Sequence, residues 1–281
     1  MDLRQQPKRA SQGVVTSRAS LPQRLNALRK RSPFSPYWME RSWLRRAMEG
    51  LSHHASGRML DVGCGERPYA EFFGNRIERY IGLEYPPVAD NLNPDVWNQP
   101  ELLRSLVDVW GDAQRLPFVD ACFDTVLAAE MLEHIPEPDA CVAEIARVVK
   151  PGGRLLLTVP LIAPLHQWPF DFYRYTPKGI EAIVQRHGFE VELITPRGNF
   201  ASATGATLSH WLVRSLAASK LHHDGSVALS RWRAPFVLPL VFVVQVFFWA
   251  CEHVSNDTAA SLGYSVVARR KVSASPPKNA P

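Results

Sequence analysis

The sequence contains little cysteine, and no two of its cysteines lie close together. The 281 residues contain four cysteines, Cys64, Cys122, Cys141 and Cys251. They form no C-x-x-C motif, and the sequence has no histidine pair at metal-ligand spacing. This pattern argues against a disulfide framework and a zinc site, so we expect reduced thiols and no metal. The first thirty residues also lack the apolar stretch of a secretory signal, and we expect a cytoplasmic protein.

Acidic residues are nearly missing from the N-terminal part of the chain. Residues 1–46 carry eleven Lys/Arg against Asp2 and Glu40, a net charge of +9, so the remaining residues contribute about −4 to the total of +5. We expect residues 1–34 to form a basic, disordered arm that is either solvated or attached to an anionic membrane surface. No aromatic-rich basic motif accompanies these charges, which makes nucleic acid the weaker candidate.

Apolar stretches alternate with helical patterns over most of the chain. The predicted strands span residues 59–62, 80–84, 106–110, 125–129, 154–159, 189–195 and 262–270, and the predicted helices span 35–51, 139–149 and 177–187. Such alternation is typical of a parallel sheet covered by helices on both faces. We therefore predict an α/β fold of the Rossmann-like, doubly wound class, in which ligands bind beyond the carboxyl ends of the strands.

Residues 199–258 interrupt this alternation. Within them, residues 234–251 carry no charge but include two prolines and a glutamine. A spanning helix needs roughly 20 apolar residues, and a single crossing would leave the sixth and last strands on opposite sides of a bilayer. We therefore predict a helical apolar insert that is either a lid over the core or lies in a membrane surface. Residues 35–198 and 259–272 form the predicted core, and residues 273–281 a disordered tail.

Acidic residues and glycines stand at the ends of four successive predicted strands. They are Asp61, Gly63, Cys64 and Gly65 at the first, Glu84 at the second, Asp112 and Ala113 at the third, and Glu130 at the fourth. Taken singly, each acidic residue is explained as well by a structural role, as a helix cap or a strand-end charge, as by ligand binding. Together, a Gly-x-Gly turn and a carboxylate at the second strand suit an adenosine-containing ligand. Pro68 stands where a dinucleotide-binding motif has its third glycine, which disfavours NAD.

The ordered set of motifs resembles the class I S-adenosylmethionine-dependent methyltransferases, and more narrowly their methyltransferase type 11 branch. The resemblance covers about residues 57–198 and the last strand, and it is carried by the segments Leu60–Gly65, Gly82–Glu84, Gly111–Phe118, Phe123–Asp124, Glu133–Ile135 and Val149–Gly153. It implies S-adenosylmethionine as the cofactor and a seven-stranded sheet whose last strand runs antiparallel between the fifth and the sixth. The chain departs from the family in the long connection from Tyr85 to Ser105, in the basic arm and in the insert.

The resemblance also implies a role for each strand-end residue. Asp61 and the turn Gly63–Gly65 would surround the methionine part of the cofactor, and Glu84 would bind the ribose. Asp112 and Ala113 would contact the adenine. Glu130 would line the floor of the cofactor site. All of these roles are expectations carried over from the family onto matching positions.

The segment 160–176, after the fifth predicted strand, mixes aromatic and ionisable residues densely. His166 can take a proton from an acceptor hydroxyl or amine, because an ordinary histidine titrates near neutrality. We expect Asp171 to orient that histidine or bind the acceptor, and Arg174 to pair with a carboxylate or phosphate. Tyr173 would contribute a ring face or its hydroxyl. The alternative is a loop held together by its own aromatic residues and an Asp171–Arg174 pair.

These observations predict methyl transfer from S-adenosylmethionine to a small molecule, which the insert suggests is apolar, lipid-linked or glycan-linked. Displacement at a sulfonium depends mainly on positioning, so no protein nucleophile is required. His134 is a rival to His166 as the base, although a structural role suits it better. Two other functions stay open: a non-catalytic, membrane-associated S-adenosylmethionine-binding protein, and an RNA or protein methyltransferase, which only the basic arm favours. The sequence does not indicate an oligomeric state.

Overall fold

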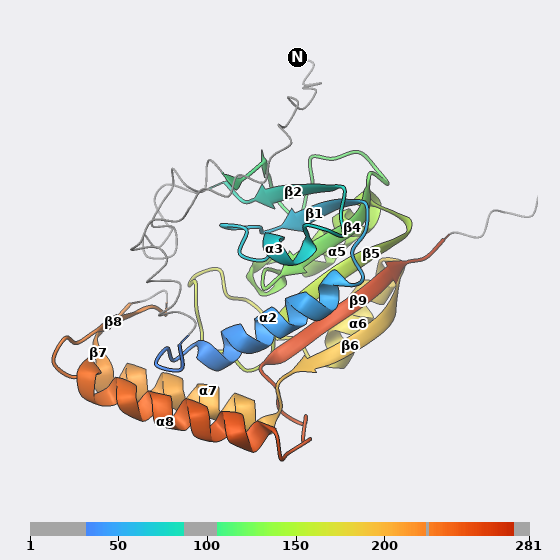
Figure 1. The fold of residues 1–281 in the computed structure, drawn as a ribbon. Coiled ribbons are helices and arrows are strands. Elements are labelled where there is room, and N and C mark those ends of the chain that lie inside the picture. The colour runs from blue at the N-terminus through green and yellow to red at the C-terminus, as the bar shows by residue number, and fades with distance from the viewer. Residues whose placement is uncertain (1–31, 87–105, 223–224, 273–281) are drawn as a thin grey trace, which may run out of the picture.

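The computed structural model describes residues 32–86, 106–222 and 225–272. The predictions for the N-terminal arm, for the tail and for the long connection after Tyr85 fall mostly or wholly outside these ranges. In the described part, a central sheet carries helices on both faces, and two long helices run side by side next to it (Figure 1).

The seven strands of the sheet are arranged in the order β3-β2-β1-β4-β5-β9-β6. They are β1 (Arg58–Val62), β2 (Arg79–Glu84), β3 (Val109–Trp110), β4 (Phe123–Ala129), β5 (Val149–Pro160), β6 (Phe189–Arg197) and β9 (Gly263–Arg270). β9 pairs antiparallel with β5 and β6, and the other neighbours pair in parallel. The predicted seven-stranded, Rossmann-like sheet with an antiparallel last strand is confirmed.

β3 is shorter than the strand predicted at residues 106–110. The Asp108 N–H donates to the Gly82 carbonyl at 3.0 Å, but the Gly82 N–H donates to Oδ2 of the Asp108 side chain at 2.9 Å. A carboxylate therefore takes the place of a backbone acceptor at this step. Regular pairing starts only at Val109, which lies opposite Leu83.

Helices α2 (Trp38–Ser52) and α3 (Ala70–Phe73) cover one face of the sheet, and α5 (Pro138–Val148) and α6 (Pro177–Arg186) cover the other (Figure 1). Side chains alternate between the faces along each strand. Leu156 of β5 accordingly packs with Met48 of α2 and Phe73 of α3, while its neighbours Leu155 and Leu157 belong to the cluster of α5 and α6. Burying one such side chain stabilises the fold by roughly 1.5–3 kcal/mol.

The start of α6 fixes the end of the loop that leaves β5. The Thr176 hydroxyl accepts a hydrogen bond from the Gly179 N–H at 3.1 Å, and Pro177 occupies the first helical turn. An N-cap threonine satisfies one of the free N–H groups of a helix start, and proline fits the first position because its missing N–H is not needed there. Residues 161–176, which we call the acceptor loop, are therefore held at both ends by regular structure.

The insert between β6 and β9 forms a layer of its own. α7 (Phe200–Leu212) continues into a π-helical turn η2 (Val213–Ala217) and a hairpin of β7 (Ala218–Leu221) and β8 (Val227–Leu229), after which α8 (Ala234–Glu252) packs back along α7. Its two helices agree with the prediction, but the sequence did not indicate the hairpin. Among the described residues, α8 is the one helix long and apolar enough to cross a membrane. Its most apolar 18-residue stretch has a mean hydropathy of 2.1, and 22% of that stretch is buried.

Candidate functional site

β1 ends in a tight turn at the carboxyl edge of the sheet. The N–H groups of Gly63 and Cys64 both donate to the Leu83 carbonyl, at 2.9 and 3.0 Å. Gly63 has a φ of +74°, and a Cβ there would stand 2.9 Å from the Met131 Cβ. A Cβ at Gly65 would meet no described atom within 4 Å. The turn thus needs glycine at position 63 and borders open space at position 65, which is the geometry for close contact with a ligand.

Asp61 lies in β1 just before this turn and is 2% exposed. Its Oδ2 accepts a hydrogen bond from the Tyr80 hydroxyl. Burial raises the pKa of Asp61 to about 7, although the Tyr80 hydrogen bond acts in the opposite direction. A cation brought next to this carboxyl would restore its charged form, so the site favours a positively charged group of a ligand.

Glu84 ends β2 beside the same turn. Its Oε2 accepts the Gly65 N–H at 2.8 Å, and its Oε1 accepts the Tyr85 N–H at 2.9 Å. Burial raises the pKa of Glu84 despite these two hydrogen bonds, which favour the ionised form. The structure therefore joins the predicted ribose carboxylate directly to the predicted glycine turn.

Asp112 and Ala113 follow β3 at the same edge of the sheet. Oδ1 of Asp112 accepts the Gln114 N–H at 2.8 Å, which holds the carboxylate in a local turn. Ala113 is buried, at 5% exposure. The carboxylate is half-buried rather than fully solvated, and among the described residues its second oxygen has a single, 3.4 Å contact, with the Gln114 side chain. This leaves Asp112 able to accept from an amine such as the one predicted.

Glu130 follows β4 in a left-handed conformation, with a φ of +50°. Its N–H donates to the Thr158 carbonyl at 3.1 Å, and its Oε1 accepts from Nη2 of Arg197 at 2.8 Å. Arg197 is 3% exposed and also donates to the Val159 carbonyl. A non-glycine residue held in this conformation is costly and concentrates at functional sites. Arg197 was not predicted, because it lies in β6, far from Glu130 in sequence.

Cys64, the middle residue of the turn, is 2% exposed. Burial raises the pKa of its thiol, and the carboxyls of Asp61 and Glu84 act in the same direction. A buried neutral thiol is a poor nucleophile. Cys64 therefore contributes packing and its backbone to the turn.

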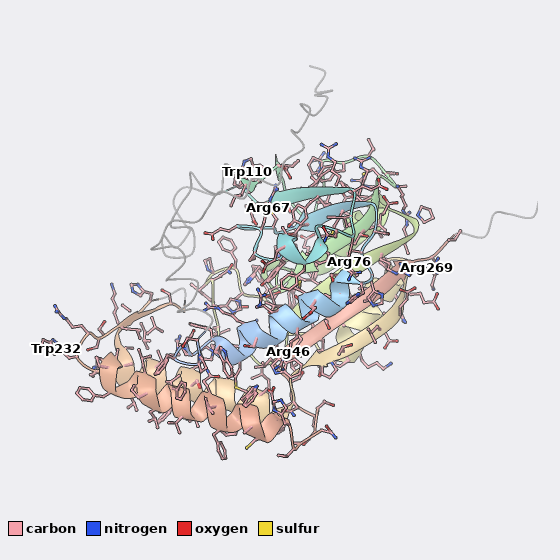
Figure 2. The ribbon with its side chains drawn as sticks, in the orientation of Figure 1. Arg46, Arg67, Arg76, Trp110, Trp232 and Arg269 are labelled. Carbon is pink, nitrogen blue, oxygen red and sulfur yellow. The ribbon has the colours of Figure 1, made fainter. Side chains whose placement is uncertain are left out.

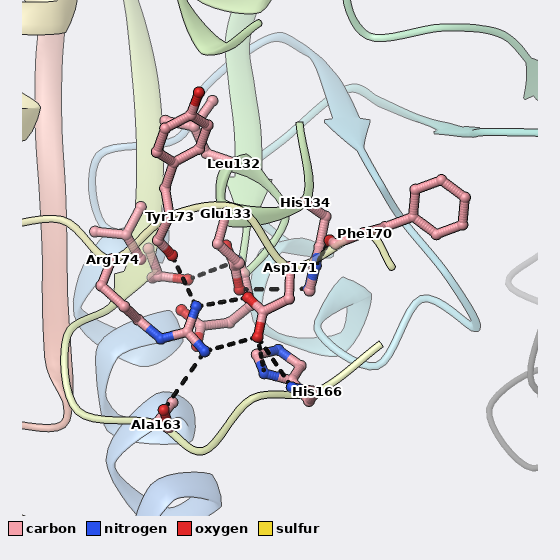
Figure 3. A network of polar contacts seen from close by, with 12 residues as sticks. Leu132, Glu133, His134, Ala163, His166, Phe170, Asp171, Tyr173 and Arg174 are labelled. Atoms are coloured by element: carbon pink, nitrogen blue, oxygen red, sulfur yellow. Dashed lines mark hydrogen bonds and ion pairs between the residues drawn. The ribbon is translucent and has the colours of Figure 1, made fainter. Parts of the chain in front are cut away.

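In the acceptor loop, Asp171 and Arg174 form a bidentate ion pair (Figure 3). Arg174 donates to both oxygens of Asp171, at 2.6 and 2.9 Å, and the Asp171 side chain is 1% exposed. Burial alone would raise the pKa of Asp171, but Arg174 and the His166 N–H hold it below its ordinary value. The guanidinium also donates to the Pro164 carbonyl at 3.2 Å. Both residues thus brace the loop, as in the alternative considered from the sequence.

His166 is the residue that this pair places. Its backbone N–H donates to Oδ2 of Asp171 at 2.9 Å, and its Nδ1 lies 3.0 Å from the Pro164 carbonyl. The His134 ring stands edge-on to it, with ring centroids 4.9 Å apart. Burial lowers the pKa of His134 to about 4, so this histidine is neutral at physiological pH. The structure therefore brings the two candidate bases together.

Glu133 lies close to the two histidines and is fully buried. Burial and the nearby Glu130 raise its pKa well above the ordinary value. Its backbone carbonyl accepts from the N–H groups of Phe172 and Tyr173, at 2.9 and 3.3 Å. The Tyr173 hydroxyl donates to the Pro136 carbonyl, and its ring is 39% exposed. Tyr173 therefore offers a ring face, while its hydroxyl is already engaged.

The insert reaches the acceptor loop through its hairpin. Gly225, before β8, has a φ of +88°, and a Cβ there would run into the Leu165 carbonyl and stand 3.1 Å from the His166 Cα. The Arg214 side chain holds this turn by donating to the Gly225 carbonyl at 2.7 Å. The hairpin therefore lies directly against the backbone of His166, a contact that the sequence did not predict.

These groups fit S-adenosylmethionine at the carboxyl edge of the sheet. Asp61 is a desolvated carboxyl that suits the cofactor's positive charge, and the turn at Gly63 leaves no room for a side chain. Glu84 and Asp112 stand at the next two strand ends, as the ribose and adenine would require. The acceptor loop follows β5 at the same edge.

The chain is similar to known methyltransferases. Residues 60–157 match the family described as methyltransferase domain. The chain is 31% identical over 137 residues to the 27-O-demethylrifamycin SV methyltransferase of Amycolatopsis mediterranei (strain S699), covering 48% of this chain and 46% of that protein. It is 39% identical over 103 residues to the fatty-acid O-methyltransferase of Mycolicibacterium smegmatis, covering 36% of each. The chain thus spans about half or less of the length of these relatives.

Among solved structures, the chain is similar to one in the complex between the Haloferax volcanii Trm112 methyltransferase activator and a methyltransferase. The TM-score is 0.51 and the identity 16%, over 84% of this chain and 94% of that one. At this identity the likeness concerns the fold alone.

Proposed function

Since the chain carries a class I S-adenosylmethionine-dependent methyltransferase domain, as the motifs predicted, we propose that it transfers a methyl group to an oxygen of an apolar small molecule. The observation that carries the proposal is the contact of the apolar insert, through Gly225, with the acceptor loop at His166. An acceptor bound there would lie between the cofactor edge of the sheet and apolar surface. The two relatives described above act, by their names, on oxygens of a rifamycin and of fatty acids.

The residues of this chain divide the work between binding and positioning. When bound, S-adenosylmethionine would supply a methyl group on a sulfonium: an acceptor oxygen would bond to the methyl carbon in line with the breaking carbon–sulfur bond, and the thioether would leave with the bonding electrons. Asp61, Glu84 and Asp112 would hold the cofactor, and the buried Asp171–Arg174 pair sets the position of His166. Because Nδ1 of His166 faces the Pro164 carbonyl, which can only accept, its lone pair is on Nε2 and is available on the acceptor side. Correct placement of the two reactants accounts for much of the rate.

The test is a methyl-transfer assay with labelled S-adenosylmethionine and a lipid and small-molecule extract, preceded by a calorimetric titration of the cofactor. We expect cofactor binding and a labelled apolar product. His166→Ala should lower turnover at least about tenfold and leave cofactor affinity unchanged. His187→Ala, at a surface histidine paired with Asp139, is the matched control. Cofactor binding without any labelled product would favour a non-catalytic S-adenosylmethionine-binding protein. Label in RNA or protein would favour an RNA or protein methyltransferase.

We further propose that α8 rests on a membrane surface, and that the protein acts in the cytoplasm at the inner face of that membrane. One face of α8 packs on α7, and the opposite face exposes Phe236, Leu240, Val243 and Phe247 to solvent, at 82, 46, 59 and 59%. Trp232, 76% exposed, points away from the body at the end of this layer (Figure 2). Arg231 and Arg233 flank it, and the basic arm would add attraction to anionic lipid.

Sedimentation with vesicles of anionic and of neutral phospholipid tests this placement. We expect the full chain to bind anionic vesicles, and we expect the double substitution Phe236→Ser and Phe247→Ser to weaken binding. Val119→Ser, at a residue 75% exposed elsewhere on the surface, should have no effect. Equal binding by all three proteins, or none by the unaltered chain, would contradict the proposal. β6 and β9 flank the insert and pair with each other, so we propose a surface contact rather than a single crossing.

A further inference from the structure

Three side chains with metal-ligating atoms meet beyond the carboxyl ends of β4 and β5. They are Glu133 and His134, in the 3-10 helix η1 (Leu132–His134), and His166 of the acceptor loop. One ligand atom from each lies within 4.8 Å of the others. Figure 3 shows them gathered beside the Asp171–Arg174 pair. The chain separates His134 from His166, so no motif along the sequence indicates the cluster.

The carboxyl of Glu133 is the strongest sign of a missing partner. Its side chain is 1% exposed, and neither of its oxygens has a hydrogen-bond partner among the described residues. An isolated buried carboxyl is strongly unfavourable unless a hydrogen bond, an ion pair or a metal compensates it. The nearest histidine nitrogen, Nε2 of His134, is 3.7 Å from Oε1, beyond hydrogen-bonding distance.

In both histidines a backbone carbonyl engages Nδ1, which leaves Nε2 as the nitrogen that can bind an ion. Nδ1 of His134 lies 2.6 Å from the Phe170 carbonyl, and Nδ1 of His166 lies 3.0 Å from the Pro164 carbonyl. A carbonyl oxygen only accepts, so each Nδ1 carries the hydrogen and each Nε2 carries a lone pair. Metal-ligating histidines are usually oriented by this same bond from the second ring nitrogen to a carbonyl.

The cations near Glu133 are already engaged. Arg174 donates to both oxygens of Asp171, and Arg197 donates to Glu130 and to the Val159 carbonyl. Neither is within ion-pair distance of the Glu133 carboxyl. A bound cation would supply the positive charge that this carboxyl lacks in the described residues.

We propose that Glu133, His134 and His166 bind a divalent first-row transition-metal ion such as Zn²⁺ or Mn²⁺. Imidazole nitrogens with one carboxylate suit such ions, and three protein ligands leave coordination positions open. The cluster includes His166 of the acceptor loop, where the proposed function puts the acceptor. There the ion would hold the acceptor hydroxyl and lower its pKa, so that its proton passes to solvent. His166 is then a ligand through Nε2 rather than the base itself.

Only this role in catalysis rests on the proposed function; the metal site itself does not. Co²⁺ is the probe, because its visible absorbance reports on the ligands and their geometry. The purified full chain is stripped with a chelator and titrated with Co²⁺, and metal content is measured in parallel. We expect one ion per chain in the unaltered protein and in the control His187→Ala. Glu133→Gln and His166→Ala should each weaken binding by at least about 10- to 100-fold, because loss of an outer-shell partner alone has an effect of that size.

The variants differ in their risk to the fold. Glu133→Gln alters a buried residue, whereas His166→Ala alters a loop residue whose side chain is 37% exposed. Titration of S-adenosylmethionine checks that each remains folded. The proposal is overturned if the unaltered chain binds no Co²⁺, or if both variants bind it as tightly as the control. Methyl transfer that continues in excess chelator would remove the ion from the reaction and leave the proposed function standing.

Discussion

The Asp171–Arg174 pair supports the sharpest quantitative prediction. It is an i,i+3 ion pair with contacts of 2.6 and 2.9 Å, and its two side chains are 1% and 22% exposed. Asp171→Ala would leave the guanidinium without its carboxylate and would also remove the acceptor of the His166 N–H. Asp171→Ala, Arg174→Met and the double variant form a thermodynamic cycle that measures the contribution of the pair.

Removing one partner of a buried ion pair costs about 3–5 kcal/mol. Water can reach part of Arg174, so we expect Asp171→Ala to lower the free energy of unfolding by about 2–4 kcal/mol. The coupling energy from the cycle should be about 1.5–3 kcal/mol. The pair Lys178–Glu181 is the matched control, because it has the same spacing and a 2.5 Å contact, but Lys178 is 89% exposed. Its coupling energy should not exceed about 0.5 kcal/mol.

Urea unfolding followed by circular dichroism measures these energies, and the methyl-transfer assay measures the effect on His166. A displacement of about 1 Å in a positioned group can cost roughly 100-fold in rate, so we expect turnover of Asp171→Ala to fall about 10- to 100-fold with unchanged cofactor affinity. The reasoning fails if the coupling energy equals that of Lys178–Glu181, because burial would then have no effect. It also fails if Asp171→Ala lowers stability but not turnover, since the pair would then not position His166.

Three further predictions concern single positions. The pKa of Asp61 is raised in the folded protein, so the protonated carboxyl stabilises the fold. This contribution is full below pH 3.8 and is lost as pH rises to about 7. Asp61→Asn should remove this part of the pH dependence of urea unfolding. Gly63→Ala should weaken cofactor binding at least about tenfold by calorimetry, because its Cβ would strike Met131, whereas Gly74→Ala, with open space around it, should bind normally. Gly225→Ala and Gly188→Ala both place alanine at a positive φ, which should cost about 1 kcal/mol. Gly225→Ala should cost more than Gly188→Ala, because its Cβ would also strike the Leu165 carbonyl, and only Gly225→Ala should reduce turnover, because only Gly225 contacts His166. Equal turnover of these two variants would argue against a hairpin that shapes the acceptor site.

The sequence could bring the candidate cofactor residues together because they lie at or directly after the ends of strands. Asp61, Glu84 and Glu130 each stand at a strand end, and parallel strands bring their carboxyl ends to one edge whatever their exact length. The structure shortened the third strand to Val109–Trp110, yet Asp112 still lies at that edge. Errors of a few residues in an element therefore do not move such a site.

The acceptor half was less predictable, because its contacts join distant segments. The sequence identified His166, Asp171, Tyr173 and Arg174 as a group, but it left open whether Asp171 and Arg174 serve a ligand or each other. The ion pair at 2.6 Å favours mutual pairing. No motif includes Arg197, so the sequence could not indicate its role, which depends on its contact with Glu130.

The sequence by itself determined the sheet, its helices and the cofactor edge, because the alternation of apolar residues and the turns after each strand are local properties. Only the tertiary structure decided which distant groups meet. It placed Arg197 on Glu130, the hairpin turn at Gly225 on the backbone of His166, and His166 beside the buried carboxyl of Glu133. Each of these contacts depends on how the insert and the acceptor loop pack on the finished sheet, and no spacing along the chain records that packing.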